Sequence, residues 1–215
     1  MVVNLGEYHS VANEFLNVLR DTALQQDRLR FRKSMERLGE IMAYEISKKL
    51  KYSKHTVQTP LGTSELALLE HKPMLTTVMR AGLPYFQGFL NYFDQSDCGF
   101  IGAWRDEKGK DQITINLEYA AIPSLQGRDL ILIDPMLATG RSFIRSTQVL
   151  LKNGNPTHLH IASLISTPEG IAYVQQNLHV PYTLWTFAID EKLNHQFYIV
   201  PGLGDAGDLS YGNKI

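Results

Sequence analysis

An acidic residue, two hydroxyl side chains and a glycine lie close together near the middle of the chain. Asp134 ends the apolar run 130–133, and Thr139, Gly140 and Ser142 follow it. The short apolar run predicts a buried strand, and the helical spacing of apolar residues after the loop predicts a helix. The first N–H groups of a helix lack intrahelical partners and carry the positive end of its dipole, so this loop is suited to binding phosphate. A carboxylate beside it suits sugar hydroxyls or a magnesium ion.

The same short pattern also fits a surface loop that leads into a capped helix and binds nothing. A Walker A loop is excluded, because it needs a glycine where this chain has Pro135 and a lysine where it has Arg141.

A second glycine-rich stretch lies near the carboxyl end, at residues 202–207. Its letters match the dinucleotide fingerprint Gly-x-Gly-x-x-Gly, but we expect no helix after it, so the strand-turn-helix unit of that fingerprint is not completed. Bare backbone here suits a small planar ligand, because adjacent C=O and N–H groups can pair with the N3–H and two carbonyls of uracil. Cytosine would leave polar groups unpaired, at about 1–3 kcal/mol each.

The composition predicts one domain over residues 1–215. The chain is 44% hydrophobic and its formal net charge is −1, which argues against a nucleic-acid interface. Cys98, the single cysteine, excludes an internal disulfide and fits a reducing compartment. No apolar run approaches the length of a membrane span, and the first residues lack the pattern of a secretion signal. We therefore expect a cytoplasmic protein.

Alternating strand and helix patterns predict an α/β fold with a parallel sheet. The expected strands are 74–79, 99–104, 130–133, 158–165 and 182–189, and the expected helices are 84–93, 141–151 and 168–177. Residues 10–50 predict two helices that come before the first sheet strand. Residues 51–69 contain Pro60 and Gly62 and are interpreted as a loop, with a possible edge strand at 56–59.

Arginines and histidines occur at the ends or on the faces of these strands. Arg80 follows strand 74–79 directly, where it either binds a ligand or faces water. The charged stretch after Arg105 leads into alternating apolar residues, which predicts a protruding β-hairpin that is able to serve as a lid. His158 and His160 share a face of their strand; without a third ligand at suitable spacing, ordinary alternation is preferred to a metal site.

The longer string at 134–140, Asp-Pro-Met-Leu-Ala-Thr-Gly, resembles the 5-phosphoribosyl pyrophosphate (PRPP) loop of the uracil phosphoribosyltransferases. These enzymes form a branch of the type I phosphoribosyltransferases, most of which carry a second acid where this chain has Pro135. The stretch at 199–206 is similar to the uracil loop of the same family. The resemblance implies a parallel-sheet type I fold with N-terminal helices at a subunit contact, a protruding β-hairpin arm at about 105–119 and a C-terminal base-binding hood at about 190–212.

The resemblance also implies roles for individual residues. The expected PRPP-binding residues are Arg80, Arg105, Asp134, Pro135, Met136, Leu137, Ala138, Thr139, Gly140, Arg141, Ser142 and Asp205. The expected uracil-binding residues are Ile199, Gly204, Asp205 and Ala206. Arg80, Arg105 and Asp205 are the expected catalytic residues, and Asp205 is the nearest candidate for a general base. Mg²⁺ is the expected cofactor, held mainly by PRPP, and no protein ligand is assigned to it.

Four features of the chain depart from the pattern of the family it resembles. Trp104 stands where tyrosine is usual, Glu118-Tyr119 replaces paired tyrosines, Arg141 occupies a position that is usually glycine, and Leu209 stands where a basic residue is common.

The activity that the resemblance implies is transfer of the phosphoribosyl group from PRPP to uracil, giving UMP and pyrophosphate in pyrimidine salvage. The expected assembly is a homodimer or a larger homo-oligomer, with no nucleic-acid or membrane partner. Two alternatives stay open: a non-catalytic regulator that senses nucleotides or PRPP, and a salvage enzyme for another nucleobase.

Overall fold

A seven-stranded sheet forms the centre of the computed structural model, which describes residues 1–106 and 114–213, without the side chains at 103–106 and 114–118. In spatial order the strands are β1 (Val2–Asn4), β11 (Tyr182–Thr186), β9 (His158–Ala162), β7 (Asp129–Ile133), β4 (Met74–Met79), β5 (Cys98–Asp106) and β6 (Thr114–Ala121). Neighbouring strands are parallel except β5 and β6, which form an antiparallel hairpin. The predicted α/β fold with a mostly parallel sheet and a hairpin arm is confirmed.

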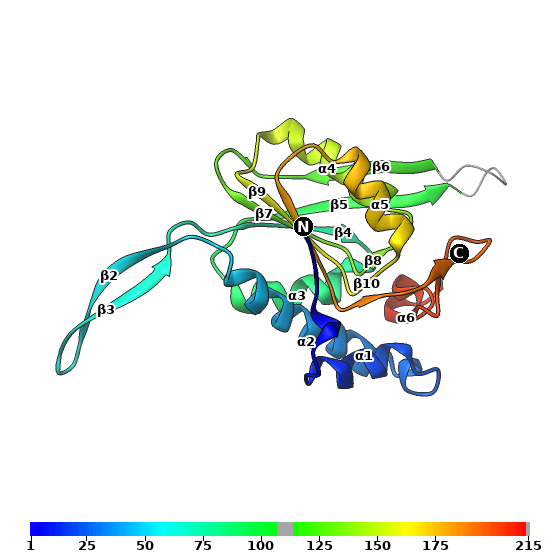
Figure 1. Ribbon diagram of the computed structural model, residues 1–215, viewed down its shortest axis with the longest axis horizontal. Helices are drawn as coiled ribbons and strands as arrows, with labels where there is room; N and C mark the ends of the chain where they lie inside the picture. The colour runs from blue at the N-terminus through cyan, green and yellow to red at the C-terminus, as the bar shows by residue number, and fades with distance from the viewer. Residues whose placement is uncertain (107–113, 214–215) are drawn as a thin grey trace.

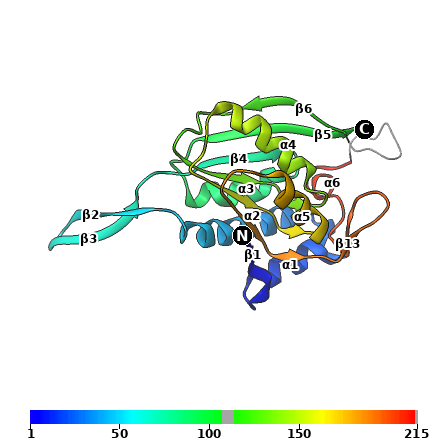
Figure 2. The ribbon, with the colours of Figure 1, turned by 45° about the horizontal axis from the view of Figure 1, so that its top comes forward.

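Helices cover both faces of this sheet, which explains why its central strands are almost continuously apolar. The helices are α1 (Ala12–Arg20), α2 (Arg28–Ser47), α3 (Gly82–Tyr92), α4 (Arg141–Leu150), α5 (Pro168–Asn177) and α6 (Ala206–Tyr211). Along β7, Ile131 and Ile133 pack with the cluster under α1, α2 and α3, while Leu130 and Leu132 pack with the cluster under α4 and α5. Figures 1 and 2 show these two helical layers. In the described residues no helix is long and apolar enough to cross a membrane.

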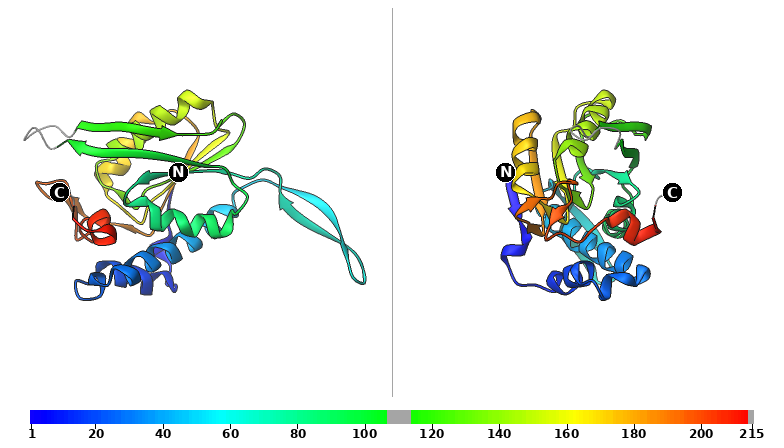
Figure 3. Two further views of the ribbon diagram at one scale, coloured as in Figure 1. Left: turned by 180° about the vertical axis from the view of Figure 1, so that it is seen from behind. Right: turned by 90° about the vertical axis from the view of Figure 1, so that its right-hand side faces the viewer.

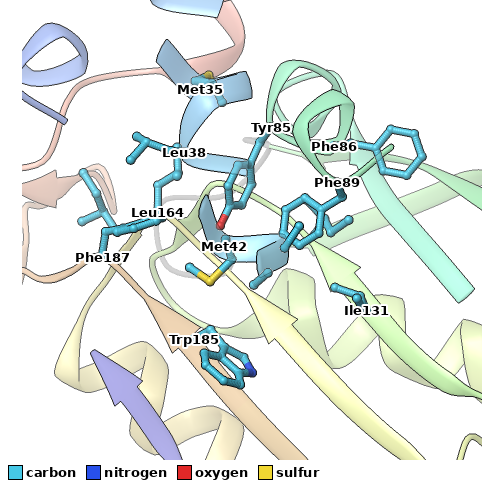
Figure 4. Close-up of a cluster of buried hydrophobic side chains, with 14 of the residues drawn as sticks. Met35, Leu38, Met42, Tyr85, Phe86, Phe89, Ile131, Leu164, Trp185 and Phe187 are labelled. Carbon is cyan, nitrogen blue, oxygen red and sulfur yellow. The ribbon is translucent and has the colours of Figure 1, made fainter. Parts of the chain in front are cut away.

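The two N-terminal helices were predicted, and α2 contributes much of the core. Its Met35, Leu38 and Met42 are fully buried and lie beside Tyr85 and Phe89 of α3 (Figure 4). Burial of these large side chains contributes roughly 1.5–3 kcal/mol each. The helical extension therefore packs its apolar stripe on the core of its own chain.

The region 51–69 is a β-hairpin, so the expectation of a loop there was wrong. Strands β2 (Tyr52–Thr59) and β3 (Gly62–Leu69) pair antiparallel, and Thr59 opposite Gly62 leaves Pro60 and Leu61 as the turn. The hairpin projects from the body (Figures 1 and 3) and most of its residues are exposed on both faces. Because neither face packs on the core, the strands lack the apolar alternation that identifies a strand in a sequence.

Two further expectations about short elements were wrong. The sheet has a strand before the helices, since β1 pairs in parallel with β11. A helix does follow the glycine-rich stretch 202–207, because α6 begins at Ala206. Both elements are too short to show a hydrophobic period, so their formation depends on tertiary contacts.

Three small elements complete the fold around the carboxyl ends of the strands. Strands β8 (Met136–Leu137), β10 (Ile165–Ser166) and β12 (Ala188–Ile189) form a parallel sheet. Strands β13 (Lys192–Leu193) and β14 (Ile199–Val200) form an antiparallel pair. We call residues 190–212, which contain this pair and α6, the hood. The hood lies at the end of the molecule opposite the β2–β3 hairpin (Figures 1 and 2).

Candidate functional site

Arg80 and Asp134 leave the sheet at the same edge. They follow the neighbouring parallel strands β4 and β7, which are in register with Thr77 opposite Ile133. The carboxyl ends of parallel strands are where open α/β folds bind ligands. The structure therefore brings these two residues, which the sequence singled out separately, to one end of the sheet.

The segment 134–142, which we call the phosphate loop, is held by backbone hydrogen bonds on one side. The carbonyl oxygen of Pro135 accepts from the N–H groups of Leu164 and Ile165 at 2.9 and 3.1 Å, and that of Leu137 accepts from Thr167 N–H at 3.1 Å. Within the loop, Met136 N–H donates to Asp134 Oδ1 at 3.2 Å. The loop is thus fixed along β10 before it enters α4.

The start of α4 has the form expected for anion binding. Gly140 is the N-cap residue with a left-handed φ of 74° and offers no capping side chain to the N–H groups of the first turn. A Cβ at Gly140 would lie 2.7 Å from the carbonyl oxygen of Gly170, so the close approach of α5 also requires glycine. Thr139 and Ser142 are half-buried beside it, while Arg141 is exposed.

Thr167 connects the phosphate loop to α5, a role that the sequence did not reveal. Its side chain is fully buried and donates from Oγ1 to the carbonyl oxygen of Ala138 at 2.6 Å. The same oxygen accepts from Gly170 N–H at 2.9 Å, which confirms the predicted N-cap. Thr167 was recognisable as a cap before Pro168, but the partner at Ala138 is distant in sequence and was not predictable.

In the hood, Asp205 is the N-cap of α6. Its Oδ1 accepts from the N–H groups of Gly207 and Asp208 at 2.8 and 3.0 Å. Ile199 and Ala206 are buried and Gly204 is exposed, with φ of 91°. Strand β14 pairs with β13 alone and lies outside the seven-stranded sheet, so despite α6 the dinucleotide-binding unit is not formed.

An ion pair joins the sheet edge to the hood. Arg80 Nη2 lies 2.7 Å from Asp208 Oδ1, and Arg80 Nη1 donates to the carbonyl oxygen of Gly212 at 3.2 Å. Apolar packing also links the two regions, since Ala138 of the phosphate loop belongs to the same buried cluster as Ile199 and Ala206. The predicted PRPP and uracil segments therefore meet at one end of the molecule.

Some predicted residues lie elsewhere or outside the description. The backbone of Arg105 is in β5, and its side chain, with those of Trp104 and Glu118, is outside the described residues, as is the arm segment 107–113. An open hollow of about 640 Å³ reaches Asp205 and Asp208 from the side of α2. Its walls contain Gln25 and Arg28 and no residue of the phosphate loop.

The described residues do not offer a complete metal site, because no three His, Cys, Asp or Glu side chains gather in a suitable cluster there. Magnesium commonly uses one or two carboxylates together with substrate phosphates and water. Carboxylates at Asp134 and Asp205 fit a metal held mainly by a diphosphate ligand.

Comparison with known proteins assigns the family. The family "Uracil phosphoribosyltransferase" matches residues 7–213. The chain belongs to the uracil phosphoribosyltransferase family. A uracil phosphoribosyltransferase of Porphyromonas gingivalis is 47% identical over 214 residues, covering 100% of this chain and 99% of the relative. One from Pyrococcus furiosus is 33% identical over 94% of this chain and 86% of the relative.

A solved structure supports the same uracil phosphoribosyltransferase assignment at the level of the fold. The AQ2163 protein from Aquifex aeolicus superimposes with a TM-score of 0.88 at 28% identity and covers 100% of both chains. The helices, the hood and the hairpin all lie within these full-length matches, so none of them is an addition to the family fold.

Proposed function

We propose that the protein transfers the 5-phosphoribosyl group of PRPP to uracil and releases UMP and pyrophosphate. The observation that carries this proposal is the meeting of a phosphate loop and a backbone-lined hood at the carboxyl end of a parallel sheet, in a chain that matches uracil phosphoribosyltransferases over its full length.

The phosphate loop supports binding of the ribose 5-phosphate. The uncapped N–H groups at the start of α4 and the hydroxyls of Thr139 and Ser142 offer hydrogen-bond donors to an anion. Pro135, Met136, Leu137, Ala138, Gly140 and Arg141 supply the remaining loop backbone that would contact PRPP. Asp134 is placed to accept from ribose hydroxyls. Fixing both groups of the sugar orients its anomeric carbon toward the hood.

Charge development defines the other roles. As the bond from the anomeric carbon to pyrophosphate breaks, the sugar gains oxocarbenium character and the leaving group gains negative charge. The guanidinium groups of Arg80 and Arg105 would stabilise that charge. Magnesium bound through PRPP, with Asp134 and Asp205 as available carboxylates, would supply further neutralisation of the pyrophosphate.

The hood supports recognition of uracil through main-chain groups. C=O and N–H groups around Ile199, Gly204 and Ala206 would pair with the N3–H and carbonyls of the base. Asp205 begins α6 between these groups and the proposed PRPP site, so its carboxylate is the candidate to accept a proton as the ring nitrogen attacks.

We further propose that the protein works in the cytoplasm as a homodimer or larger assembly. The projecting β2–β3 hairpin exposes apolar side chains, including Leu61 at 100%, Leu66 at 48% and Leu68 at 43% of their areas. Such exposure supports association with a second copy. Sedimentation equilibrium would measure the mass, and a monomer at enzyme concentrations used in assays would contradict this proposal.

The decisive test is consumption of PRPP in the presence of uracil, cytosine, xanthine and hypoxanthine. Uracil alone should support turnover, with UMP and pyrophosphate in equal amounts. Turnover with another base would assign a different salvage reaction, and binding of PRPP or nucleotide without turnover would assign a sensing protein.

A further inference from the structure

A buried ion pair fixes one residue of the hood from both sides of its backbone. Asp190 is only 7% exposed, and its carboxylate accepts from Arg20 Nη1 and Nη2 at 2.9 and 2.8 Å. Asp190 Oδ2 also accepts from the N–H of Gly202 at 2.8 Å, while Arg20 Nη1 donates to the carbonyl oxygen of Gly202 at 3.1 Å. The N–H and C=O of a single residue are therefore bound by the two members of one pair.

Gly202 is the point where the chain turns back on a predicted uracil-binding residue. Its φ is 61°, and a Cβ placed on it would lie 2.1 Å from the carbonyl oxygen of Ile199. Gly204, the next predicted uracil contact, follows two positions later. The orientation of main-chain groups from 199 to 206 thus depends on how Gly202 is held.

The hood has few hydrogen bonds of its own to fix this turn. Strands β13 and β14 contain two residues each, and α6 contains six. Arg20 comes from α1, which is 170 positions away from Asp190 in sequence. A rigid helix therefore supplies a fixed reference for a segment with little regular structure.

We propose that Arg20 and Asp190 are positioning residues that set the main chain of 199–206 for uracil. This inference rests on the proposed uracil phosphoribosyltransferase activity. Neither side chain is assigned a contact with substrate; both act through Gly202. A buried pair often adds little net stability, because desolvation offsets its attraction, so fixing one conformation is the role that the geometry favours. The bidentate fork also requires arginine specifically.

The test is the conservative variant Arg20→Lys, which keeps the charge but loses the bidentate contact and the bond to Gly202. Steady-state kinetics are measured with uracil varied at saturating PRPP, and then with PRPP varied at saturating uracil. KM for uracil should rise about tenfold, as expected from loss of one charge-assisted hydrogen bond, while KM for PRPP stays within about twofold. Asp190→Asn should raise KM for uracil in the same way.

Arg128→Lys is the matched control, because Arg128 forms an ion pair with Asp97 at the amino end of the strands. It should leave both KM values unchanged. The double variant Arg20→Lys/Asp190→Asn should show no larger rise than either single variant, because both changes release the same residue. Thermal unfolding of each variant checks that the protein is folded.

Three results would overturn the proposal. An unchanged KM for uracil in a folded Arg20→Lys protein refutes positioning while leaving the activity intact. Equal rises in both KM values show a general structural role. If the wild-type protein forms no UMP, the activity itself is refuted and the positioning role falls with it.

Discussion

Replacing Thr167 by valine should weaken PRPP binding without changing the affinity for uracil. The substitution conserves volume and removes the hydroxyl that donates to Ala138 at 2.6 Å and accepts from Gly170 at 2.9 Å. Loss of an N-cap costs about 1 kcal/mol, and loss of the bond to a buried carbonyl costs about another 1 kcal/mol. The free energy of unfolding should therefore fall by about 2 kcal/mol. If all of that energy holds the phosphate loop in its binding conformation, KM for PRPP rises at most about 30-fold.

Two variants control this prediction. Thr167→Ser keeps the hydroxyl and should keep most of the PRPP affinity. Thr147→Val removes another buried hydroxyl, which donates to Phe143 at 2.8 Å within α4. That bond is internal to the helix, so KM for PRPP should not change.

The assays are urea unfolding at equilibrium and initial rates with PRPP varied at saturating uracil. A Thr167→Val protein that loses about 2 kcal/mol of stability but keeps the wild-type KM for PRPP would refute the reasoning. In that case the hydroxyl stabilises the fold and the loop keeps its conformation without it.

The remaining predictions concern the loop, the proposed base and a buried histidine. Gly140→Ala places a Cβ at φ 74° and 2.7 Å from Gly170, so KM for PRPP should rise and urea unfolding should show a loss of about 1–2 kcal/mol; an unchanged KM would contradict the anion site. Asp205→Asn keeps a helix-capping side chain, so in steady-state assays kcat should fall far more than uracil affinity, and unchanged turnover would remove Asp205 from the mechanism. Burial lowers the pKa of His160 from 6.5 to about 4, so the unfolded chain binds the proton more tightly and stability is lost as the pH falls from 6.5 toward 4. Urea unfolding should show a fall of about 2 kcal/mol from this group between pH 7 and pH 4.5, and His160→Asn should remove that component of the pH dependence.

The phosphate loop was predictable because its features are local. An apolar strand, an acid, a glycine at the helix start and a helical period follow one another directly, and each has its own physical signature. Strand β4 and helix α5 were predicted within the same limits for the same reason. The meeting of Arg80 and Asp134 then followed from the rule that parallel strands present their carboxyl ends together.

The missed elements depend on contacts that no local pattern encodes. Strand β1 forms because an edge of the sheet is available at β11. The β2–β3 hairpin is exposed on both faces and therefore shows no core-facing period. The pair of Arg20 and Asp190 joins residues from opposite ends of the chain, and arginine on an amphipathic helix ordinarily indicates a solvated face.

The two halves of the site are supported by different parts of the scaffold. The phosphate loop is held by β10 and by Thr167 at the start of α5, while the turn at Gly202 is held from α1 by Arg20. Because these supports share no residue, loosening one should not loosen the other. A protein with both Thr167→Val and Arg20→Lys should therefore show the two separate rises in KM, each close to its value in the single variant. A rise well beyond the single values would mean that the loop and the hood move as one unit, and that binding of one substrate depends on order at the other's site.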